Sequence, residues 1–446
     1  MDAILYWNKV SLDVTKVDFS SSDPAVNPTP QQGGPTRTSR ALAIVHLAMY
    51  DAWVGIQGGP KYLTYSATEV PAVSNDLPTA QVAVATAAAL TLIALFSRQK
   101  DEIWKEHGKF VASVSSQAAQ ISNGINYGSL VAAKMLASRE GDGSEASNDA
   151  YVPNVGAGYH RADPTSPGQG FLGPLWGNVK PFGIAQLNTK VPGSPPPALN
   201  SAAYAQDYKK VMEKGRSQGS TRTPEETTIG LFWAYDGPRN IGVPPRLYNQ
   251  VIRAISKKQG VSEADNARLF AMINVAMADA GIQAWAEKYK YNIWRPVLGI
   301  READAGWGPT GKGDENPKTA GDPYWMPLGA PPTNQPGKAA ATPNFPAYPS
   351  GHATFGTAAI RAAANMLCLP DTFAFTLVSE ELNGESVGAT GVRARHERKL
   401  TIASAIEENV LSRVYLGVHW EFDGREGEKN GQVIGKLVAE NFPAMS

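Results

Sequence analysis

Apolar residues recur three and four positions apart along most of this chain, which is the spacing of one face of an α-helix. Extended runs that alternate apolar and polar residues and are rich in Val, Ile and Thr are scarce. The sequence therefore predicts an all-α protein. The expected helices cover residues 38–57, 78–97, 99–115, 117–140, 200–217, 223–235, 244–258, 263–294, 351–368, 371–383, 397–416 and 424–442.

Two long stretches, residues 141–199 and 302–349, lack this periodicity and are rich in proline and glycine. Segments this long inside a compact protein are usually functional covers rather than simple linkers. We therefore expect two packed helical bundles with long connections, in one compact unit. The expected division is an N-terminal helical region at 1–220 and a C-terminal region at 221–446 that carries the chemistry.

The charge balance excludes several classes of function. The 446 residues contain 41 Lys and Arg against 41 Asp and Glu, so no overall field attracts nucleic acid.

The single cysteine, Cys368, excludes an internal disulfide and a thiolate-rich metal centre. Any bound metal or metal oxide must then be held by histidine and oxygen ligands.

The N-terminus has no basic segment leading into an apolar stretch and a small-residue cleavage site, so it predicts no signal peptide. Localisation is otherwise unspecified. A cytoplasmic protein is the default expectation, and a secreted one follows if a leader was trimmed. The uncharged run 80–96 is only about long enough to cross a bilayer and is rich in small residues, so we expect a buried helix and no membrane span.

Three short motifs in the second half carry the candidate chemistry. The first contains Lys288 and Arg295-Pro296. Seven residues are close to two helical turns, so both cations are expected on one helix face, which Trp285 shares one turn earlier. A solvated basic face would give the same pattern.

The second motif is Pro349-Ser350-Gly351-His352, which leads into a helix-forming segment. Ser350 and the Gly351 amide are expected at the helix start, where unpaired N–H groups attract anions. His352 would then lie beside a bound anion. Alternatively, Ser350 is only a helix cap and His352 a surface residue.

The third motif is Ser412-Arg413 followed by His419. Gly417 can end the helix and let the chain carry His419 back toward Arg413. Asp423 follows four residues later and could fix the imidazole tautomer. A purely structural histidine is the alternative.

Together the motifs offer three fixed cations, a helix-start amide, a hydroxyl and two histidines, without the carboxylate cage that Mg²⁺ or Ca²⁺ requires. Each cation at ~4 Å attracts an anion by about 4 kcal/mol at an effective dielectric near 20, before desolvation. This pattern indicates a site for a highly charged tetrahedral oxyanion.

The three motifs in this order resemble the signature of the vanadium-dependent haloperoxidases. The similarity to the fungal vanadium chloroperoxidases extends over most of the chain, and the stretches that carry it are ILYWNKVSLDV, SRALAIVHLAMYDAW, FWAYDGPRNIGVPPRLYNQ, NFPAYPSGHATFG and LSRVYLGVHWEFD. Compared with those fungal enzymes, this chain looks shorter between residues 384 and 411 and after Asp423. The family's fold, two four-helix bundles, agrees with the helical pattern.

The resemblance also implies roles for individual residues. His419 would coordinate vanadium, and His352 would act as the acid–base group when peroxide binds. The equatorial oxygens of vanadate would be hydrogen-bonded by Lys288, Arg295, Arg413, Ser350 and the Gly351 amide. Trp285 and Phe345 match the walls of the proposed halide site, and Asp236 matches the acidic partner of Arg413.

The implied enzyme uses vanadate, with no haem and no flavin, as a Lewis acid that activates hydrogen peroxide toward a halide ion. The product is hypohalous acid, which halogenates a small organic acceptor. Phe345 favours chloride plus bromide, and iodide would also be oxidised. The alternative is an acid phosphatase on the same oxyanion site, with His419 as nucleophile and His352 as leaving-group acid. A non-catalytic phosphate-binding protein is a third reading, which the presence of His352 disfavours.

Overall fold

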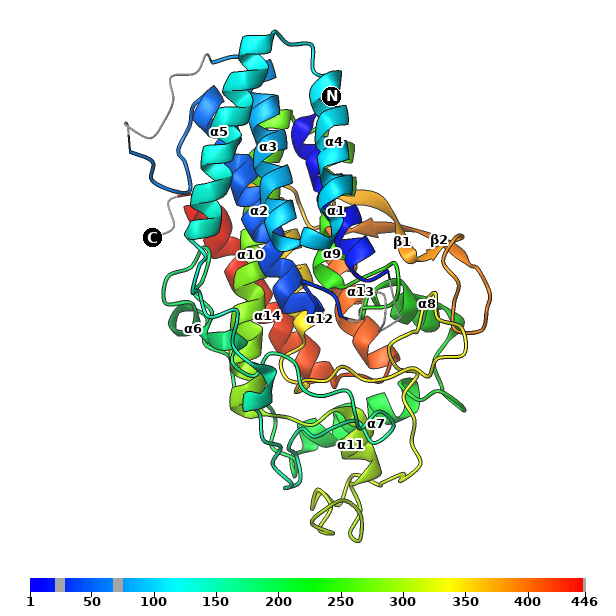
Figure 1. The fold of residues 1–446 in the computed structure, drawn as a ribbon. Coiled ribbons are helices and arrows are strands. Elements are labelled where there is room, and N and C mark those ends of the chain that lie inside the picture. The colour runs from blue at the N-terminus through cyan, green and yellow to red at the C-terminus, as the bar shows by residue number, and fades with distance from the viewer. Residues whose placement is uncertain (21–28, 67–74, 444–446) are drawn as a thin grey trace.

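The computed structural model describes residues 1–20, 29–66 and 75–443, and most of them are helical (Figure 1). Helices shorter than two turns occur only within the long connections and next to the main helices, in this described part of the chain. The main helices are α1 (Ala3–Asp18), α2 (Gly34–Gln57), α3 (Leu77–Leu95), α4 (Lys100–Ser113), α5 (Ala118–Ala137), α7 (Ala202–Lys214), α8 (Pro224–Phe232), α9 (Pro244–Gln259), α10 (Glu263–Tyr291), α12 (Gly351–Met366), α13 (Ile402–Tyr415) and α14 (Glu421–Asn441).

The expected helices form, with one exception, and their ends mostly lie within a few residues of the predicted ones. Helix α1 was not expected; it begins after Asp2, whose side chain accepts a hydrogen bond from the Leu5 amide at 2.8 Å. The short helix α11 (Pro296–Arg301) was also missed. The prediction of an all-α architecture is confirmed.

The predicted helix over 371–383 is wrong. Residues Ala374–Asn383 form strand β1, which pairs antiparallel with strand β2 (Arg395–Thr401). Burial alternates along most of β1, as expected for a strand with one face on the core. Good helix formers near its end concealed this alternation, and the pairing partner lies too far along the chain for local spacing to indicate it. Because β2 begins at Arg395, α13 starts at Ile402 rather than 397.

Helix α10 runs along the molecule and joins its two halves (Figure 1). It packs against α2 on the N-terminal side and against α12 and α14 on the C-terminal side. Helices α1 to α5 form one bundle, and α9, α10, α12, α13 and α14 form the other. One continuous hydrophobic core runs through both. The division at residue 220 stays a prediction.

Two helix pairs approach so closely that only glycine fits between them. In the C-terminal bundle, Gly427, Gly431 and Gly435 follow each other every four residues along α14 and face α12. A Cβ atom on Gly427 would lie 2.6 Å from the carbonyl oxygen of Ser350. In the N-terminal bundle, a Cβ atom on Gly124 of α5 would lie 2.8 Å from the carbonyl oxygen of Thr79 in α3. Close backbone approach therefore sets the position of both pairs.

The two long connections lie against the C-terminal bundle and against each other. The Leu172 amide donates to the carbonyl of Asn344 at 3.0 Å, which joins the first connection to the second. The indole Nε1 of Trp285 on α10 donates to the carbonyl of Leu172 at 3.1 Å. The connections thus cover the end of the bundle where α12 begins.

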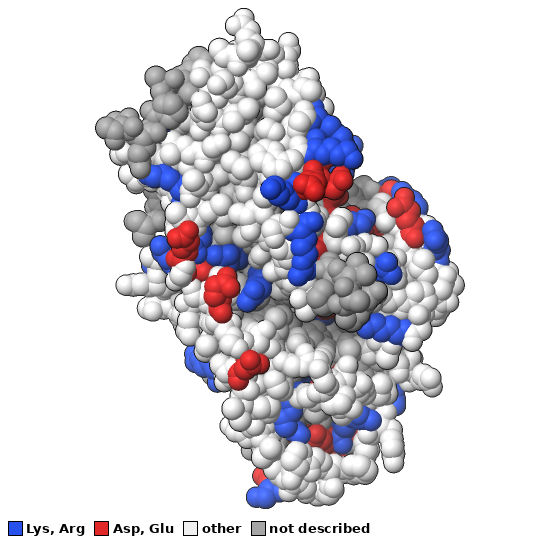
Figure 2. Space-filling model, viewed as in Figure 1, with Lys and Arg blue, Asp and Glu red and all other residues white. Residues whose placement is uncertain are grey.

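Among the residues that the structure describes, two helices, α3 and α10, are long and apolar enough to cross a membrane, but 72% and 94% of their most apolar windows are buried within the fold. Burial of this kind is typical of core helices. Figure 2 shows lysine and arginine side chains interspersed with aspartate and glutamate on the visible face, which agrees with the balanced composition.

Candidate active site

His419 lies between α13 and α14 because Gly417 turns the chain. Gly417 has φ 72°, a left-handed conformation that favours glycine. The imidazole Nδ1 lies 2.9 Å from Oδ2 of Asp423, and Nε2 lies 2.9 Å from Nη1 of Arg295. Because a guanidinium only donates, Nε2 must be the accepting nitrogen and Nδ1 carries the proton. Burial, with the charge of Arg295, holds the pKa of His419 well below its usual value. The expected return of His419 toward this site and its pairing with Asp423 are confirmed.

Arg413 is fully buried at the end of α13 and is held by one carboxylate. Its Nη2 donates to Oδ1 of Asp236 at 2.6 Å. Its Nε and Nη1 make no hydrogen bond to the residues that the structure describes. The structure therefore brings Arg413 and Asp236 together and leaves two buried donors of Arg413 without an acceptor.

Arg295 and Lys288 meet at the site, but not in the way their spacing predicted. Helix α10 ends at Tyr291, and Asn292 adopts a left-handed conformation with φ 55°. Arg295 is the residue before α11, so the prediction that both cations share one helix face is wrong. The chain reversal at Asn292, rather than helical periodicity, brings them together.

The two side chains have different partners. Arg295 donates to the carbonyls of Phe345 at 2.9 Å and Val418 at 2.8 Å, and its Nη2 has no partner among the described residues. The ammonium of Lys288 donates to three carbonyls, those of Pro346, Ala347 and Pro349. All three of its N–H groups are thus engaged, and a hydrogen bond to a bound oxyanion would replace one of these contacts.

The buried cations repel each other. Burial lowers the pKa of Arg295 to about 9, with Arg413 adding to the effect. Burial and the charge of Arg295 also hold the pKa of Lys288 well below its usual value. An anion bound among these residues would relieve this repulsion, so the site is electrostatically complementary to an oxyanion.

Helix α12 begins in the centre of the site, as its motif predicted. Ser350 is the N-cap, and its side chain accepts from the Ala353 amide. His352 lies in the first turn, and its Nε2 lies 2.6 Å from the carbonyl oxygen of Ala234. A carbonyl only accepts, so Nε2 carries the proton and Nδ1 is free to accept one. Burial lowers the pKa of His352 to about 3, with Arg413 adding to the effect.

Trp285 and Phe345 form an aromatic wall beside the cations. Their ring centroids are 4.8 Å apart. The Lys288 ammonium lies 5.2 Å from the centroid of Phe345, and the Arg295 guanidinium lies 4.9 Å from it. Gly351 is close to this wall, since a Cβ atom there would lie 3.1 Å from the Trp285 ring. All the residues that the sequence singled out therefore meet in one region.

The sequence did not indicate Glu381, which supports the backbone of this region. Tyr235 lies between Ala234 and Asp236 and has φ 44°, which is strained for a bulky residue. Its amide donates to Oε1 of Glu381 at 2.9 Å. Burial raises the pKa of Glu381 to about 8, and its neighbour Asp236 contributes in the same direction. Glu381 was assigned to the helix that does not form, so no sequence signal placed it here.

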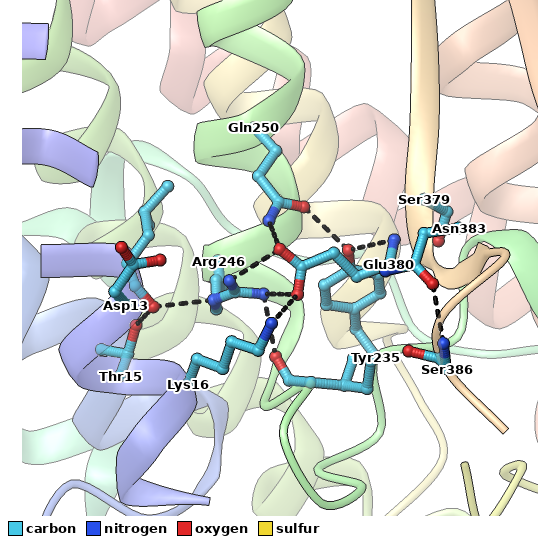
Figure 3. Close-up of polar contacts among 12 residues, drawn as sticks. Asp13, Thr15, Lys16, Tyr235, Arg246, Gln250, Ser379, Glu380, Asn383 and Ser386 are labelled. Carbon is cyan, nitrogen blue, oxygen red and sulfur yellow. Dashed lines mark hydrogen bonds and ion pairs between the residues drawn. The ribbon is translucent and has the colours of Figure 1, made fainter. Parts of the chain in front are cut away.

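Figure 3 shows the polar contacts that hold Tyr235 on its other side. The Tyr235 hydroxyl donates to Gln250 at 2.7 Å and accepts from the Glu380 amide at 2.9 Å. The Glu380 carboxylate receives two hydrogen bonds from Arg246, at 2.6 and 2.8 Å. Strand β1 and helix α9 together therefore fix the backbone that carries Ala234 and Asp236.

The donor set fits a tetrahedral oxyanion such as vanadate. Three buried guanidinium nitrogens, Nη2 of Arg295 and Nε and Nη1 of Arg413, have no acceptor among the described residues. The accepting Nε2 of His419 can serve as a metal ligand, and Asp423 orients it. Within residues 1–20, 29–66 and 75–443, no group of three or more His, Cys, Asp or Glu residues could hold a bare metal ion.

Comparisons with known proteins agree with this site. A family model described as the vanadium chloroperoxidase N-terminal domain matches residues 1–173, and one described as the VCPO second helical-bundle domain matches residues 268–445. The vanadium chloroperoxidase of Curvularia inaequalis is 31% identical in an alignment that covers 94% of this chain and 78% of that protein.

Two solved structures share the fold. A bacterial vanadium-dependent iodoperoxidase has a TM-score of 0.71 at 20% identity, covering 97% of this chain and 95% of its own. A bacterial vanadium-dependent chloroperoxidase in its holo form has a TM-score of 0.65 at 15% identity, covering 95% and 96%. These two likenesses show the fold, and the family models together with the Curvularia relative show that the chain belongs to the vanadium-dependent haloperoxidase family.

Proposed function

We propose that this chain holds vanadate and uses hydrogen peroxide to oxidise chloride and bromide, and also iodide, to hypohalous acid, which halogenates small organic acceptors. The observation that carries the proposal is the set of three unpaired guanidinium nitrogens beside the accepting Nε2 of His419. Buried donors without acceptors are costly, and an oxyanion would satisfy all of them.

In this proposal His419 Nε2 is the ligand to vanadium, and Arg295, Arg413, Ser350 and the Gly351 amide hold the oxygens. Lys288 would join them by exchanging one of its carbonyl contacts. When bound, vanadate supplies a Lewis acid that activates peroxide toward attack by a halide ion. Asp423 keeps the proton on Nδ1 of His419, which leaves the Nε2 lone pair for the metal.

His352 is proposed as the group that accepts a proton from hydrogen peroxide. Its Nε2 already donates to the Ala234 carbonyl, so the proton would go to Nδ1. The low pKa of His352 keeps the ring neutral before peroxide arrives, so its Nδ1 carries no proton. Asp236, whose Oδ1 is 3.9 Å from His352 Nε2, would stabilise the protonated ring.

The aromatic wall supports the oxidation of chloride as well as of bromide. Trp285 and Phe345 exclude water next to Lys288, which strengthens its field and leaves a halide ion less solvated. Chloride is the harder halide to oxidise and needs such an environment most. The C. inaequalis relative carries the name chloroperoxidase, while one fold relative is called an iodoperoxidase.

A phosphatase is the second candidate, because phosphate and vanadate have the same shape. His419, oriented by Asp423, could act as a nucleophile. The similarity to the chloroperoxidase over 94% of the chain and the aromatic wall beside the cations favour the peroxidase.

The test is halogenation of monochlorodimedone with peroxide, with chloride, bromide and iodide each tried before and after orthovanadate is added. Activity should appear with vanadate and fall when phosphate competes. Activity that is indifferent to vanadate, or that needs haem or flavin, would exclude the proposal. Hydrolysis of p-nitrophenyl phosphate without any halide oxidation would favour the phosphatase.

A further inference from the structure

A cavity of about 760 Å³ opens onto the site and is larger than its inorganic substrates need. Its buried end is formed by His352 and His419, with the partly buried ring of Phe345 beside them. A water molecule occupies roughly 30 Å³, and hydrogen peroxide and halide ions are of similar size. Cavities of about 300–1,000 Å³ are typical of sites for organic ligands. The volume therefore suggests that an organic molecule enters beside the reacting atoms.

Three cations line the accessible part of this cavity, and we call them the cationic rim: Arg37, Arg239 and Lys338. Arg239 and Lys338 are exposed and Arg37 is half-buried. None of them contacts a carboxylate within the described residues. Arg239 Nε donates to the carbonyl of Ser20 at 2.7 Å, and Lys338 donates to the side chain of Gln335 at 3.4 Å. Arg37 makes no ion pair or side-chain hydrogen bond there.

The cavity has little negative charge to offset this rim. The only acidic residue among its described lining is Asp236, which is paired with Arg413. Arg37 also lies in the first turn of α2, whose N-cap, Gly33, provides no side chain to the free amides. A cleft lined by one sign of charge concentrates ligands of the opposite sign.

Apolar side chains also line the cavity. They include Phe19, Leu172, Val243 and Phe355. A ligand that suits both parts has an anionic group for the rim and a flat apolar body for the walls. A free halide ion would use only the first feature.

We propose that the cavity binds an anionic aromatic acceptor, such as a phenol that carries a carboxylate, with the carboxylate at the cationic rim and the ring toward Phe345. This rests on the proposed function, which supplies hypohalous acid at the buried end. The hypohalous acid transfers its halogen to a ring carbon of the acceptor, and that carbon loses its proton. The proton and the released hydroxide form water, so ArH and HOX become ArX and H₂O.

The first experiment measures binding without turnover. The vanadate-loaded protein, without peroxide or halide, is titrated calorimetrically with 4-hydroxybenzoate and with its neutral methyl ester. We expect saturable binding of the carboxylate, at least about 10-fold tighter than the ester, since only the carboxylate can form charge-assisted hydrogen bonds with the rim. Equal affinities, or no saturable binding, would overturn the proposal.

The second experiment uses the double variant Arg37→Gln/Lys338→Gln. Affinity for 4-hydroxybenzoate should fall by about 10-fold or more, whereas affinity for the ester should change little. The matched control is Lys312→Gln, an exposed lysine in the same connection that lies outside this cavity. An equal loss in the control would mean that the cations act only through overall charge.

The third experiment uses turnover. A mixture of the two phenols is halogenated with bromide and peroxide, and the product ratio is compared with that from reagent hypobromite. The enzyme should give a higher ratio of halogenated 4-hydroxybenzoate to halogenated ester than reagent hypobromite gives. In the rim variant this ratio should move back toward the reagent value. If the rim variant instead raises the bromide KM, with the product ratio equal to the reagent ratio throughout, the rim only steers small anions and the proposal fails. Absence of bromide oxidation would refute the proposed function, while the binding data would still test the rim.

Discussion

The α3–α5 pair and the α12–α14 pair are both packed through glycines, yet only the second borders the candidate active site. In both, glycines let one helix backbone approach the other. The polar side chains of α3 are satisfied within the bundle: Thr86 and Thr91 donate to the carbonyls of Val82 and Ala87. At the start of α12, buried guanidinium groups have donors without acceptors. Close packing fixes the positions of the helices in both pairs, whereas the unpaired buried guanidinium groups at α12 give that region its expected affinity for an anion.

The histidines of the two regions show the same difference. His46 on α2 is fully buried, and both ring nitrogens have partners, Asn8 at 2.9 Å and the carbonyl of Leu42 at 2.7 Å. His419 is as deeply buried, but its Nε2 faces a guanidinium that could contact an oxyanion instead. Burial of a histidine alone is therefore no sign of function, whereas its partners are.

The largest expected effect is the difference in vanadate affinity between variants of these two histidines. His419→Ala should weaken vanadate binding by at least about 1,000-fold, about 4 kcal/mol, because it removes the proposed bond to the metal. His46→Ala should cost about 1–3 kcal/mol of unfolding free energy through its lost hydrogen bonds and leave vanadate affinity within about threefold. Equilibrium dialysis and urea denaturation measure the two quantities. Vanadate retained by His419→Ala would remove that residue from the site.

The next effect concerns the buried carboxyl groups of the two regions. The pKa of Glu381 is raised from 4.5 to about 8, mainly by burial. Between these values the unfolded chain loses a proton that the folded protein keeps, so folding stability falls as pH rises. Glu381→Gln removes this dependence. The stability of the variant relative to the parent should rise by up to about 4 kcal/mol from pH 5 to pH 8.

A matched control exists in the N-terminal bundle. Burial raises the pKa of Asp51 from 3.8 to about 6, so Asp51→Asn should show a weaker trend, confined to about pH 4–6. Denaturation curves at several pH values make the comparison. If both variants gave parallel curves, the pKa of Glu381 would be raised no more than that of Asp51, and its placement beside Asp236 would need revision.

The glycine pairs themselves give a smaller effect. Gly427→Ala and Gly128→Ala each place a methyl group against a backbone carbonyl, that of Ser350 or of Ala83, and should each cost about 1–3 kcal/mol of stability. Only Gly427→Ala should also weaken vanadate binding, by about 10-fold, because a shift of Ser350 would also displace the Gly351 amide that is proposed to contact vanadate. Thermal denaturation and dialysis test this. A similar loss of vanadate affinity in Gly128→Ala would mean that the site responds to overall stability.

The smallest effect is a change in halide preference. Phe345→His places a polar, titratable ring beside Lys288 and Arg295 and lets water in, so chloride oxidation should fall several-fold while bromide oxidation and vanadate affinity are kept. The pH optimum should also change. Steady-state rates for both halides from about pH 4 to 8, at matched vanadate occupancy, test this.

Phe110→His is the control in the N-terminal bundle, where the ring packs against Tyr6 and Trp7. It should lower stability and leave the chloride-to-bromide ratio unchanged. Equal losses of chloride and bromide oxidation in Phe345→His would show that Phe345 is core packing and that halide preference is set elsewhere.

Local pattern was enough to predict most of the helices and to single out the residues that the fold brings together at the candidate site. The start of α12 at Gly351 follows from its N-cap serine and the proline before it, and the end of α13 follows from Gly417. These signals lie within a few residues of the feature they specify. The motifs also indicated an oxyanion site, because the residue types limit the chemistry wherever the chain places them.

Tertiary structure decided what local pattern could not. Lys288 and Arg295 meet because Asn292 ends α10, and β1 forms because residues 395–401 pair with it. Glu381 supports Tyr235 only through that strand, and the cationic rim gathers Arg37, Arg239 and Lys338 from three separate parts of the chain. The sequence by itself determined which groups are available and which segments are helical. Their partners, pKa values and common cavity depend on contacts between residues far apart in the chain, whose free energies arise only when the fold excludes water around them.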